Sequence, residues 1–202
     1  MHEILIATGN AGKLREYRDL LGELPIQLLS LHDVGLADMQ VDETGHTFTA
    51  NAMLKARAYA LASGKATIAD DSGLCVDALD GAPGVLSARY AGADATDAQR
   101  RAHLLDALRD VAESQRSARF VCVIALVDPM DGMAQTVEGV CEGHIALAES
   151  DGGHGFGYDA LFVPSGYDAT FADLDGAAKH SLSHRGAAAR ALLPLLRGRI
   201  GA

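Results

Sequence analysis

Two adjacent carboxylates, Asp70 and Asp71, follow a short apolar run in the segment 66-ATIADDSG-73. Two acids in contact repel each other, so folding alone is a poor reason for the pair. In extended backbone adjacent side chains point to opposite faces, so one carboxylate could face a ligand while its neighbour braces the turn or a metal shell. Carboxylates suit Mg²⁺ and can activate a water for attack on phosphorus. The alternative is an Asx-type turn, in which both aspartates accept backbone N–H groups.

A candidate anion site lies in 8-TGNAGK-13, between an apolar run and a helical pattern. The N–H groups of such a turn and of a helix N-terminus attract anions, and Lys13 adds a mobile cation. The spacing is not that of a Walker A loop, and the Ser or Thr that follows the lysine there is missing. An ordinary turn with a surface lysine is the alternative.

A third group combines Glu43, in the loop segment 42-DETG-45, with Asn51 and Lys55. Asn51 and Lys55 are four residues apart, so on a helix they share one face. The neighbouring glycine would let the Glu43 loop come close to a ligand. The alternative is a solvated loop beside a helix surface.

Two segments near the C-terminus suit a flat ligand with polar edges. In 153-GHGFGYD-159, alternating glycines would let backbone approach the ligand, and an aromatic ring could stack on a base; a tight turn is the alternative. In 179-KHSLSHRG-186, His180 and His184 have the spacing of two zinc ligands on a helix, but a third ligand is not evident. We favour a capping role for Ser183, with Lys179, His184 and Arg185 as donors to an anion or carbonyl.

The elements that must position these residues alternate between strand and helix patterns, which predicts a mixed α/β fold. The expected C-terminal helix starts near Ser183, and Pro194 would kink or shorten it. Gly64 suits the end of the second helix. The expected strands are 3–7, 26–31, 66–69, 74–79, 119–127 and one strand or a pair within 134–147, and the other expected helices are 13–24, 48–63 and one that starts at Thr96 or Asp97 and runs to Val111.

Composition limits the class of protein. The 202 residues suit one domain, or one domain with a small lobe, and 49% hydrophobic residues allow a sizeable core. A net charge of −10 argues against broad binding to nucleic-acid polymers. Neither a membrane span nor a signal peptide is expected. The three cysteines are widely separated, so reduced thiols in a cytoplasmic protein are expected rather than disulfides.

Taken together, these segments closely resemble the inosine/xanthosine triphosphate pyrophosphatase family of house-cleaning nucleotide hydrolases. The match is in both order and spacing and runs from about residue 4 to residue 197. The four patterns TGNxGK, ADDSG, GFGYD and SHRG in this order are together far more specific than any one alone. The matching segments are TGNAGK, ETG with the helix bearing NAMLKA, IADDSGL, GAPGVLSARYAG, GGHGFGYDALF and SHRG.

The resemblance implies a single domain, residues 1–202, of two lobes without a clean boundary. It implies a long central mixed β-sheet with flanking helices, a deep cleft between the lobes (an ITPase-like, or anticodon-binding-like, architecture) and a homodimer. The implied activity is Mg²⁺-dependent hydrolysis of ITP, dITP, XTP and dXTP to the nucleoside monophosphate and pyrophosphate.

The resemblance also implies a role for each site residue. Asp71 would be the catalytic base and would share Mg²⁺ with Glu43, supported by Asp70. The substrate-binding residues would be Thr8, Gly9, Asn10, Ala11, Gly12, Lys13, Asn51, Lys55 and Ser72 around the triphosphate, and Phe156, Gly157, Tyr158, Asp159, Lys179, His184 and Arg185 around the base.

Selectivity would come from donors aimed at the 6-oxo group of hypoxanthine or xanthine. These donors would face the amino group of adenine and be left unpaired, at about 1–3 kcal/mol each. Guanine also carries a 6-oxo group, so rejection of GTP needs a separate device. Two alternatives stay open: a non-catalytic nucleotide sensor, and a pyrophosphatase for other modified nucleotides.

Overall fold

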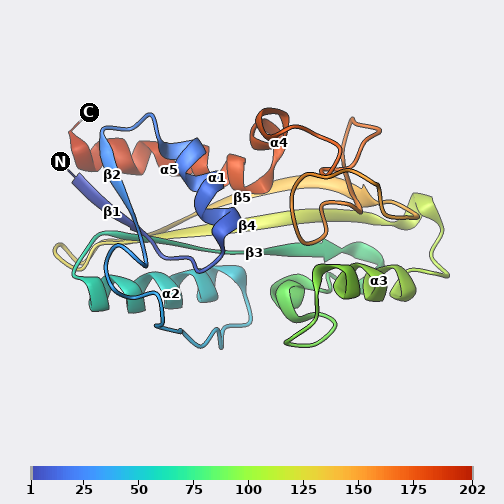
Figure 1. Cartoon of the computed structure of the whole chain (residues 1–202), viewed down its shortest axis with the longest axis horizontal. Helices are drawn as coiled ribbons and strands as arrows, with labels where there is room; N and C mark the ends of the chain where they lie inside the picture. Colours follow the sequence, from blue (N-terminus) through green and yellow to red (C-terminus); the bar gives the residue numbers. More distant parts are fainter. Residues whose placement is uncertain (1, 202) are drawn as a thin grey trace. The chain divides into compact units, whose positions relative to one another are not determined.

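The computed structural model describes residues 2–201 and contains one six-stranded mixed sheet with flanking helices (Figure 1). The strand order is β2-β1-β3-β4-β5-β6; β1 is parallel to β2 and β3, and β5 is antiparallel to β6. The predicted mixed α/β fold is therefore confirmed. The strands are β1 (His2–Ile6), β2 (Ile26–Ser30), β3 (Thr67–Val76), β4 (Ser117–Val127), β5 (Ala134–Ile145) and β6 (Phe162–Pro164). The helices are α1 (Ala11–Leu21), α2 (Phe48–Ser63), α3 (Asp97–Ala107), α4 (Gly176–Leu182) and α5 (His184–Ile200), with short 3₁₀ turns at Asp77–Leu79, Gly84–Arg89 and Glu113–Gln115.

The chain divides into two compact units, each with its own hydrophobic core. Unit 1 comprises the chain up to Asp71, the segment Cys122–Gly139 and the chain from Gly186 onward. Unit 2 comprises Ser72–Val121 and Val140–Arg185. The divisions fall inside β3, β4 and β5, so each of these three long strands contributes residues to both units.

Unit 1 is built on strands covered by helices on both faces. Ile4 and Ile6 of β1 pack in one core cluster with Tyr17 of α1 and Leu192 of α5, which places α1 and α5 on the same face of the sheet. The buried side of α2 includes Ala56 and lies on the other face, as Figure 1 shows. Buried strands with apolar residues on alternating faces are expected where helices cover both sides.

Two helix boundaries in unit 1 follow from local sequence. The Asn10 side chain accepts hydrogen bonds from the N–H groups of Gly12 (2.8 Å) and Lys13 (3.0 Å), so α1 begins at an asparagine N-cap. Helix α2 ends where Gly64 adopts a left-handed conformation, with φ of 66°, and donates its N–H to the carbonyl of Ala60. The sequence-based expectation for Gly64 is confirmed.

In unit 2, α3 packs against the parts of β3, β4 and β5 that belong to this unit. Its core joins Leu104 of α3 to Phe120 of β4, Phe162 of β6 and Phe171. The Phe120 and Phe162 rings meet edge to face, with centroids 4.7 Å apart. Thr96 and Gln99 form a reciprocal capping box that starts α3, one of the two predicted starting points.

Three expectations from the sequence need correction. Asp70 and Asp71 do not follow a strand end, because β3 is continuous from Thr67 to Val76 and both aspartates lie inside it. The helix expected to run to Val111 ends as α3 at Ala107, whereas one of the two alternatives for 134–147, a single strand, is confirmed as β5. Helix α5 continues through Pro194 to Ile200, so this proline does not shorten it.

None of the helices that the structure describes is both long and apolar enough to cross a membrane.

Candidate active site

In unit 1, Asp70 forms an ion pair with Lys13 from the first turns of α1. The Lys13 Nζ lies 2.8 Å from the Asp70 Oδ2, and the aspartate side chain is only 1% exposed. The buried thiol of Cys122 lies 3.9 Å from the same oxygen. Removing one partner of a buried ion pair typically costs about 3–5 kcal/mol, so this pair ties α1 firmly to β3.

The neighbouring Asp71 contacts α2 instead. Asn51 donates its Nδ2–H to the Asp71 Oδ2 at 3.1 Å, and the Lys55 Nζ lies 3.7 Å from the Asp71 Oδ1. The same Lys55 Nζ lies 3.0 Å from the Glu43 Oε2. Because Asn51 and Lys55 are one turn apart on α2, they reach the same carboxylate from one helix face.

Burial and neighbouring charges shift the pKa values of Asp71 and Lys55 in opposite directions. Burial raises the pKa of Asp71, and this effect outweighs the opposing influence of the Lys55 ammonium and the Asn51 hydrogen bond. Burial alone would lower the pKa of Lys55, but the carboxylates of Asp70, Asp71 and Glu43 outweigh it and raise that pKa. A carboxylate with a raised pKa is a better proton acceptor than an ordinary aspartate, which suits a general base.

The loop that carries Glu43 is held by a close approach between Gly45 and Asn51. The Gly45 N–H donates to the Asn51 Oδ1 at 2.8 Å, and a Cβ at Gly45 would lie 2.6 Å from that oxygen. Asn51 is fully buried, so its amide joins the Glu43 loop to Asp71. The sequence indicated that a glycine here allows a close approach, but not that its partner is Asn51.

The predicted anion-binding turn, Thr8 to Lys13, lies between β1 and α1. The N–H groups of Gly12 and Lys13 are held by the Asn10 cap, and the Asn10 N–H donates to the Thr8 Oγ1 at 3.2 Å. Gly9 and Ala11 are exposed. An anion at the start of α1 would therefore compete with the Asn10 side chain for two backbone donors and would meet Lys13.

In unit 2, the Lys179 Nζ lies 2.7 Å from the Asp159 Oδ2, and both side chains are more than nine-tenths buried. The same oxygen accepts the Phe156 N–H at 2.7 Å. Lys179 and Arg185 both lie beside the Phe156 ring, with the Nζ 5.2 Å and the guanidinium carbon 5.8 Å from its centroid. These distances fit cation–π contacts, which brings the ring and both cations together.

Gly155 fits this arrangement for a physical reason. Its φ is +84°, and a Cβ there would overlap the Asp159 carboxylate. A glycine is therefore required for the turn to close around Asp159.

The remaining predicted base-site residues are also in unit 2. His184 is buried and stacks on Phe120, with ring centroids 4.7 Å apart and planes at 11°. Arg185 donates to the Ser72 Oγ at 3.1 Å. Tyr158 is buried, donates its hydroxyl to the Ser87 carbonyl at 2.9 Å, and has a pKa raised above its usual value by burial.

Among residues 2–201, groups of three or more histidine, cysteine, aspartate or glutamate side chains arranged to hold a metal ion are absent. Lys55 forms ion pairs with both Glu43 and Asp71, and Lys13 forms an ion pair with Asp70. These carboxylates offer the hard oxygen donors that Mg²⁺ prefers, and Mg²⁺ usually needs only one or two of them together with waters and phosphate oxygens. The donor set therefore fits a magnesium ion that arrives with phosphates.

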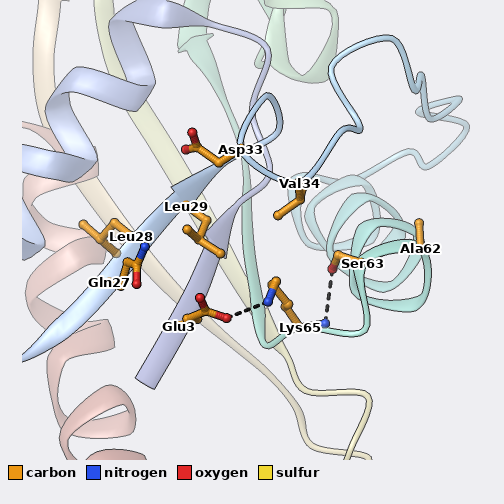
Figure 2. Close-up of a pocket in the computed structure, with 9 residues that line it drawn as sticks. All are labelled: Glu3, Gln27, Leu28, Leu29, Asp33, Val34, Ala62, Ser63 and Lys65. Atoms are coloured by element: carbon orange, nitrogen blue, oxygen red, sulfur yellow. Dashed lines mark hydrogen bonds and ion pairs between the residues drawn. The ribbon is translucent and has the colours of Figure 1, made fainter. Parts of the chain in front are cut away.

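A cavity of about 530 Å³ lies elsewhere in unit 1, as Figure 2 shows. None of the predicted site residues lines it. Its charged groups are already paired: the Lys65 Nζ lies 2.6 Å from the Glu3 Oε2, and Asp33 accepts hydrogen bonds from Ser30. The predicted site residues described above lie around Asp71 in unit 1 and around Phe156 in unit 2. The lining residues are Glu3, Gln27, Leu28, Leu29, Asp33, Val34, Ala62, Ser63 and Lys65.

Two residues near this machinery were not predicted as site residues. Asp97 and Arg101 of α3 contact the backbone of Gly157 in the loop that carries Phe156. Their spacing of four residues places them on one helix face, but their target is more than fifty residues away in the chain. Only this i, i+4 pair of opposite charges could have indicated them.

Known proteins are similar to this chain over almost its whole length. It is 50% identical over 199 residues to a dITP/XTP pyrophosphatase of Nocardia farcinica, which covers 97% of this chain and 95% of the relative. It is 44% identical over 185 residues to a dITP/XTP pyrophosphatase of Oceanobacillus iheyensis, covering 92% and 93%. The structure of a HAM1 protein from Coxiella burnetii is similar with a TM-score of 0.89 and 43% identity, covering 98% of this chain and 100% of that one.

The sequence model of the Ham1 family matches residues 4–195. This range includes every predicted site residue, from Thr8 to Arg185. The motifs, the fold and the relatives agree, and the chain belongs to the Ham1 family.

Proposed function

We propose that this protein hydrolyses the non-standard purine nucleoside triphosphates ITP, dITP, XTP and dXTP to the nucleoside monophosphate and pyrophosphate. The relatives at 44–50% identity are named dITP/XTP pyrophosphatases. The observation that carries the proposal is the position of Asp71, a buried carboxylate held by Asn51 and Lys55 of one helix face. A protein that binds a polyanion without a metal ion gains nothing from such buried acids.

Asp71 acts as the general base in this proposal. Its carboxylate accepts a proton from a water whose oxygen forms a bond to the α-phosphorus. The bond between that phosphorus and the oxygen bridging to the β-phosphorus then breaks, and pyrophosphate leaves with the electron pair. The raised pKa of Asp71 supports this role, because proton transfer is most efficient when the base has a pKa closer to the working pH.

Glu43, Asp71 and Asp70 are the residues that would hold the magnesium ion. When bound, Mg²⁺ supplies neutralisation of phosphate charge and lowers the pKa of a coordinated water. Asn51 keeps the Glu43 loop and Asp71 in a fixed relation, because its amide donates to Asp71 and accepts from Gly45.

In this proposal the triphosphate is bound by the ammonium groups of Lys13 and Lys55 and by nearby hydrogen-bond donors. Lys13 and Lys55 now neutralise Asp70, Asp71 and Glu43. Phosphate oxygens would take over these two ammonium groups and leave the carboxylates free for the metal ion. Ser72 and the Thr8–Lys13 turn would supply further hydrogen-bond donors.

In this proposal the base is recognised by residues of unit 2 around the Phe156 ring. Phe156 offers an aromatic face, and Lys179, Arg185 and His184 offer donors to an oxo group. Adenine presents an amino group at the same edge, so the donors would stay unpaired and ATP would be disfavoured. Asp159 sets the position of Lys179 through their 2.7 Å ion pair.

A substrate panel tests the proposal. Purified protein is incubated with Mg²⁺ and ITP, XTP, dITP, ATP, GTP and a modified pyrimidine triphosphate, and pyrophosphate and orthophosphate are assayed separately. We expect pyrophosphate from the 6-oxo purines and far less from ATP. Orthophosphate as the only inorganic product, equal rates with ATP, or nucleotide binding without any product would each contradict the proposal.

A homodimer and a cytoplasmic location remain predictions from the family resemblance. Light scattering coupled to size-exclusion chromatography tests the first: a mass of about 42 kDa, twice the 21.1 kDa of one chain, is expected. A mass of one chain at micromolar concentration would contradict it.

A further inference from the structure

Helix α3 forms hydrogen bonds with both the backbone N–H and the backbone carbonyl of Gly157, in the loop that carries Phe156. The Gly157 N–H donates to the Asp97 Oδ2 at 2.8 Å, and the Gly157 carbonyl accepts a hydrogen bond from the Arg101 guanidinium at 2.9 Å. Asp97 and Arg101 are one helical turn apart, so one face of α3 contacts this loop on both sides of the Gly157 Cα. Gly157 adopts a left-handed conformation with φ of +61°.

Both side chains are themselves braced. The Arg101 Nε lies 2.8 Å from the Glu149 Oε2, so the guanidinium is fixed by a second partner. Asp97 also pairs with Arg100, whose guanidinium in turn donates to the carbonyls of Ala88 and Ala95 at 2.7 and 2.6 Å. Burial raises the pKa of Asp97, but the hydrogen bonds from Arg100 and Gly157 lower it more, so the carboxylate stays charged.

The contact of Asp97 with Gly157 is not explained by a role in capping the N-terminus of α3. Thr96 is the N-cap of α3, and its side chain accepts the Gln99 N–H while Gln99 returns the hydrogen bond. The first turn is therefore already capped without Asp97. The Asp97 carboxylate is instead directed to the loop, sixty residues further along the chain.

The Gly157 peptide is connected to the residues that would recognise the base. Phe156 precedes Gly157, and its N–H donates to Asp159, which holds Lys179. A shift of the Gly157 peptide would therefore move the Phe156 ring and loosen the Asp159–Lys179 pair. A displacement of about 1 Å in a recognition group is enough to weaken binding substantially.

We infer that Asp97 and Arg101 are positioning residues for purine-base recognition: they hold the Gly157 peptide so that Phe156, Asp159 and Lys179 present one fixed surface to the base. This inference rests on the proposed function for the identity of the ligand. It adds α3, which carries none of the expected substrate contacts, to the determinants of specificity.

The test separates base binding from phosphate binding. Calorimetry at fixed Mg²⁺ measures the affinity for an ITP analogue with a methylene group between the α- and β-phosphates, and for inorganic tripolyphosphate, which has no base. We expect Asp97→Ala and Arg101→Gln each to weaken binding of the ITP analogue about tenfold and to leave binding of tripolyphosphate within twofold of wild type. The preference for ITP over ATP in turnover should fall in the same variants.

The same helix offers matched controls. Asp106 and Arg109 form an exposed ion pair, 3.3 Å between side chains that are each 70% exposed. Asp106→Ala and Arg109→Gln repeat the chemical changes and should leave both affinities unchanged, and thermal melting checks that all four variants fold.

Affinity of the Asp97 and Arg101 variants for the ITP analogue within twofold of wild type would overturn the inference, as would equal weakening of analogue and tripolyphosphate. Failure of the proposed function would look different, because the wild-type protein would then release no pyrophosphate from ITP. Wild-type protein that binds neither probe would contradict both.

Discussion

Asp71 is the residue on which the proposed chemistry depends, and its neighbours suit a base more than a structural ion pair. The Lys55 Nζ lies 3.7 Å from the Asp71 Oδ1 and 3.0 Å from the Glu43 Oε2. Asp70 differs, because its Oδ2 lies 2.8 Å from the Lys13 Nζ and its own side chain is almost fully buried. Adjacent aspartates thus have separate tasks, since β3 turns them toward different helices.

Asp71→Asn should lower kcat for ITP by about 10²–10⁴-fold, because the amide cannot accept the proton of the attacking water. Asn51 and Lys55 can still contact the isosteric side chain, so the melting temperature should change little. Steady-state kinetics and thermal melting check this. A kcat within tenfold of wild type would exclude Asp71 as the base, and Asp106→Asn serves as an exposed control.

Lys55→Met should strengthen the binding of Mn²⁺, used as a probe for Mg²⁺, when nucleotide is absent. The wild-type ammonium occupies the space near both Glu43 and Asp71, and its removal leaves two carboxylates without that cation. Electron paramagnetic resonance of free Mn²⁺ gives the affinity without any turnover. Lys65→Met, which breaks the Lys65–Glu3 pair elsewhere in unit 1, is the matched control. Weaker or unchanged Mn²⁺ binding in the Lys55 variant would contradict this competition.

The loop after β5 shows how one element depends on a single backbone conformation. Gly155→Ala should lower the free energy of unfolding by about 1–3 kcal/mol and weaken ITP binding, because the new Cβ meets Asp159 in a left-handed conformation. Gly153→Ala places its Cβ where no atom lies within 4 Å, so it should change stability by less than about 1 kcal/mol. Urea unfolding of both variants measures the difference. Equal stability of the two would refute the proposed role of Gly155.

Local sequence patterns predicted the elements that obey local rules. The turn at 8–13 before the first helix, the Gly64 end of α2 and the buried strand β4 were predicted from glycine positions and hydrophobic periodicity. The reading of β3 failed for a physical reason. Charged residues are rarely buried inside strands, so Asp70 and Asp71 indicated a strand end. Their burial is possible because Lys13, Asn51 and Lys55 reach them from α1 and α2.

Across the whole molecule, contacts between residues far apart in the chain could not be predicted from sequence patterns. The five motif segments were found because each has a distinctive composition, and the resemblance gave them roles. Asp97 and Arg101 have ordinary helix composition, and their Gly157 contact joins positions far apart in the chain. Periodicity and capping rules describe neighbours along the chain, so contacts of this kind become visible only in three dimensions.

None of Cys75, Cys122 and Cys141, all within the described residues, forms a disulfide, and we predict that their thiols react slowly. Burial raises the pKa of Cys141 to about 11 and also raises that of Cys75, while Cys122 is fully buried. Since the thiolate is the reactive form, a disulfide reagent at pH 8 should titrate no thiol rapidly in the native protein and three after denaturation. Rapid reaction of any thiol in the native state would contradict this prediction.

In the proposed reaction water attacks the α-phosphorus, and isotope labelling shows whether it does. Hydrolysis of ITP in ¹⁸O-labelled water, with the products resolved by mass spectrometry, shows which phosphorus received the oxygen. We predict one ¹⁸O in inosine monophosphate and none in the pyrophosphate. Label in the pyrophosphate, or in orthophosphate released beside inosine diphosphate, would contradict it.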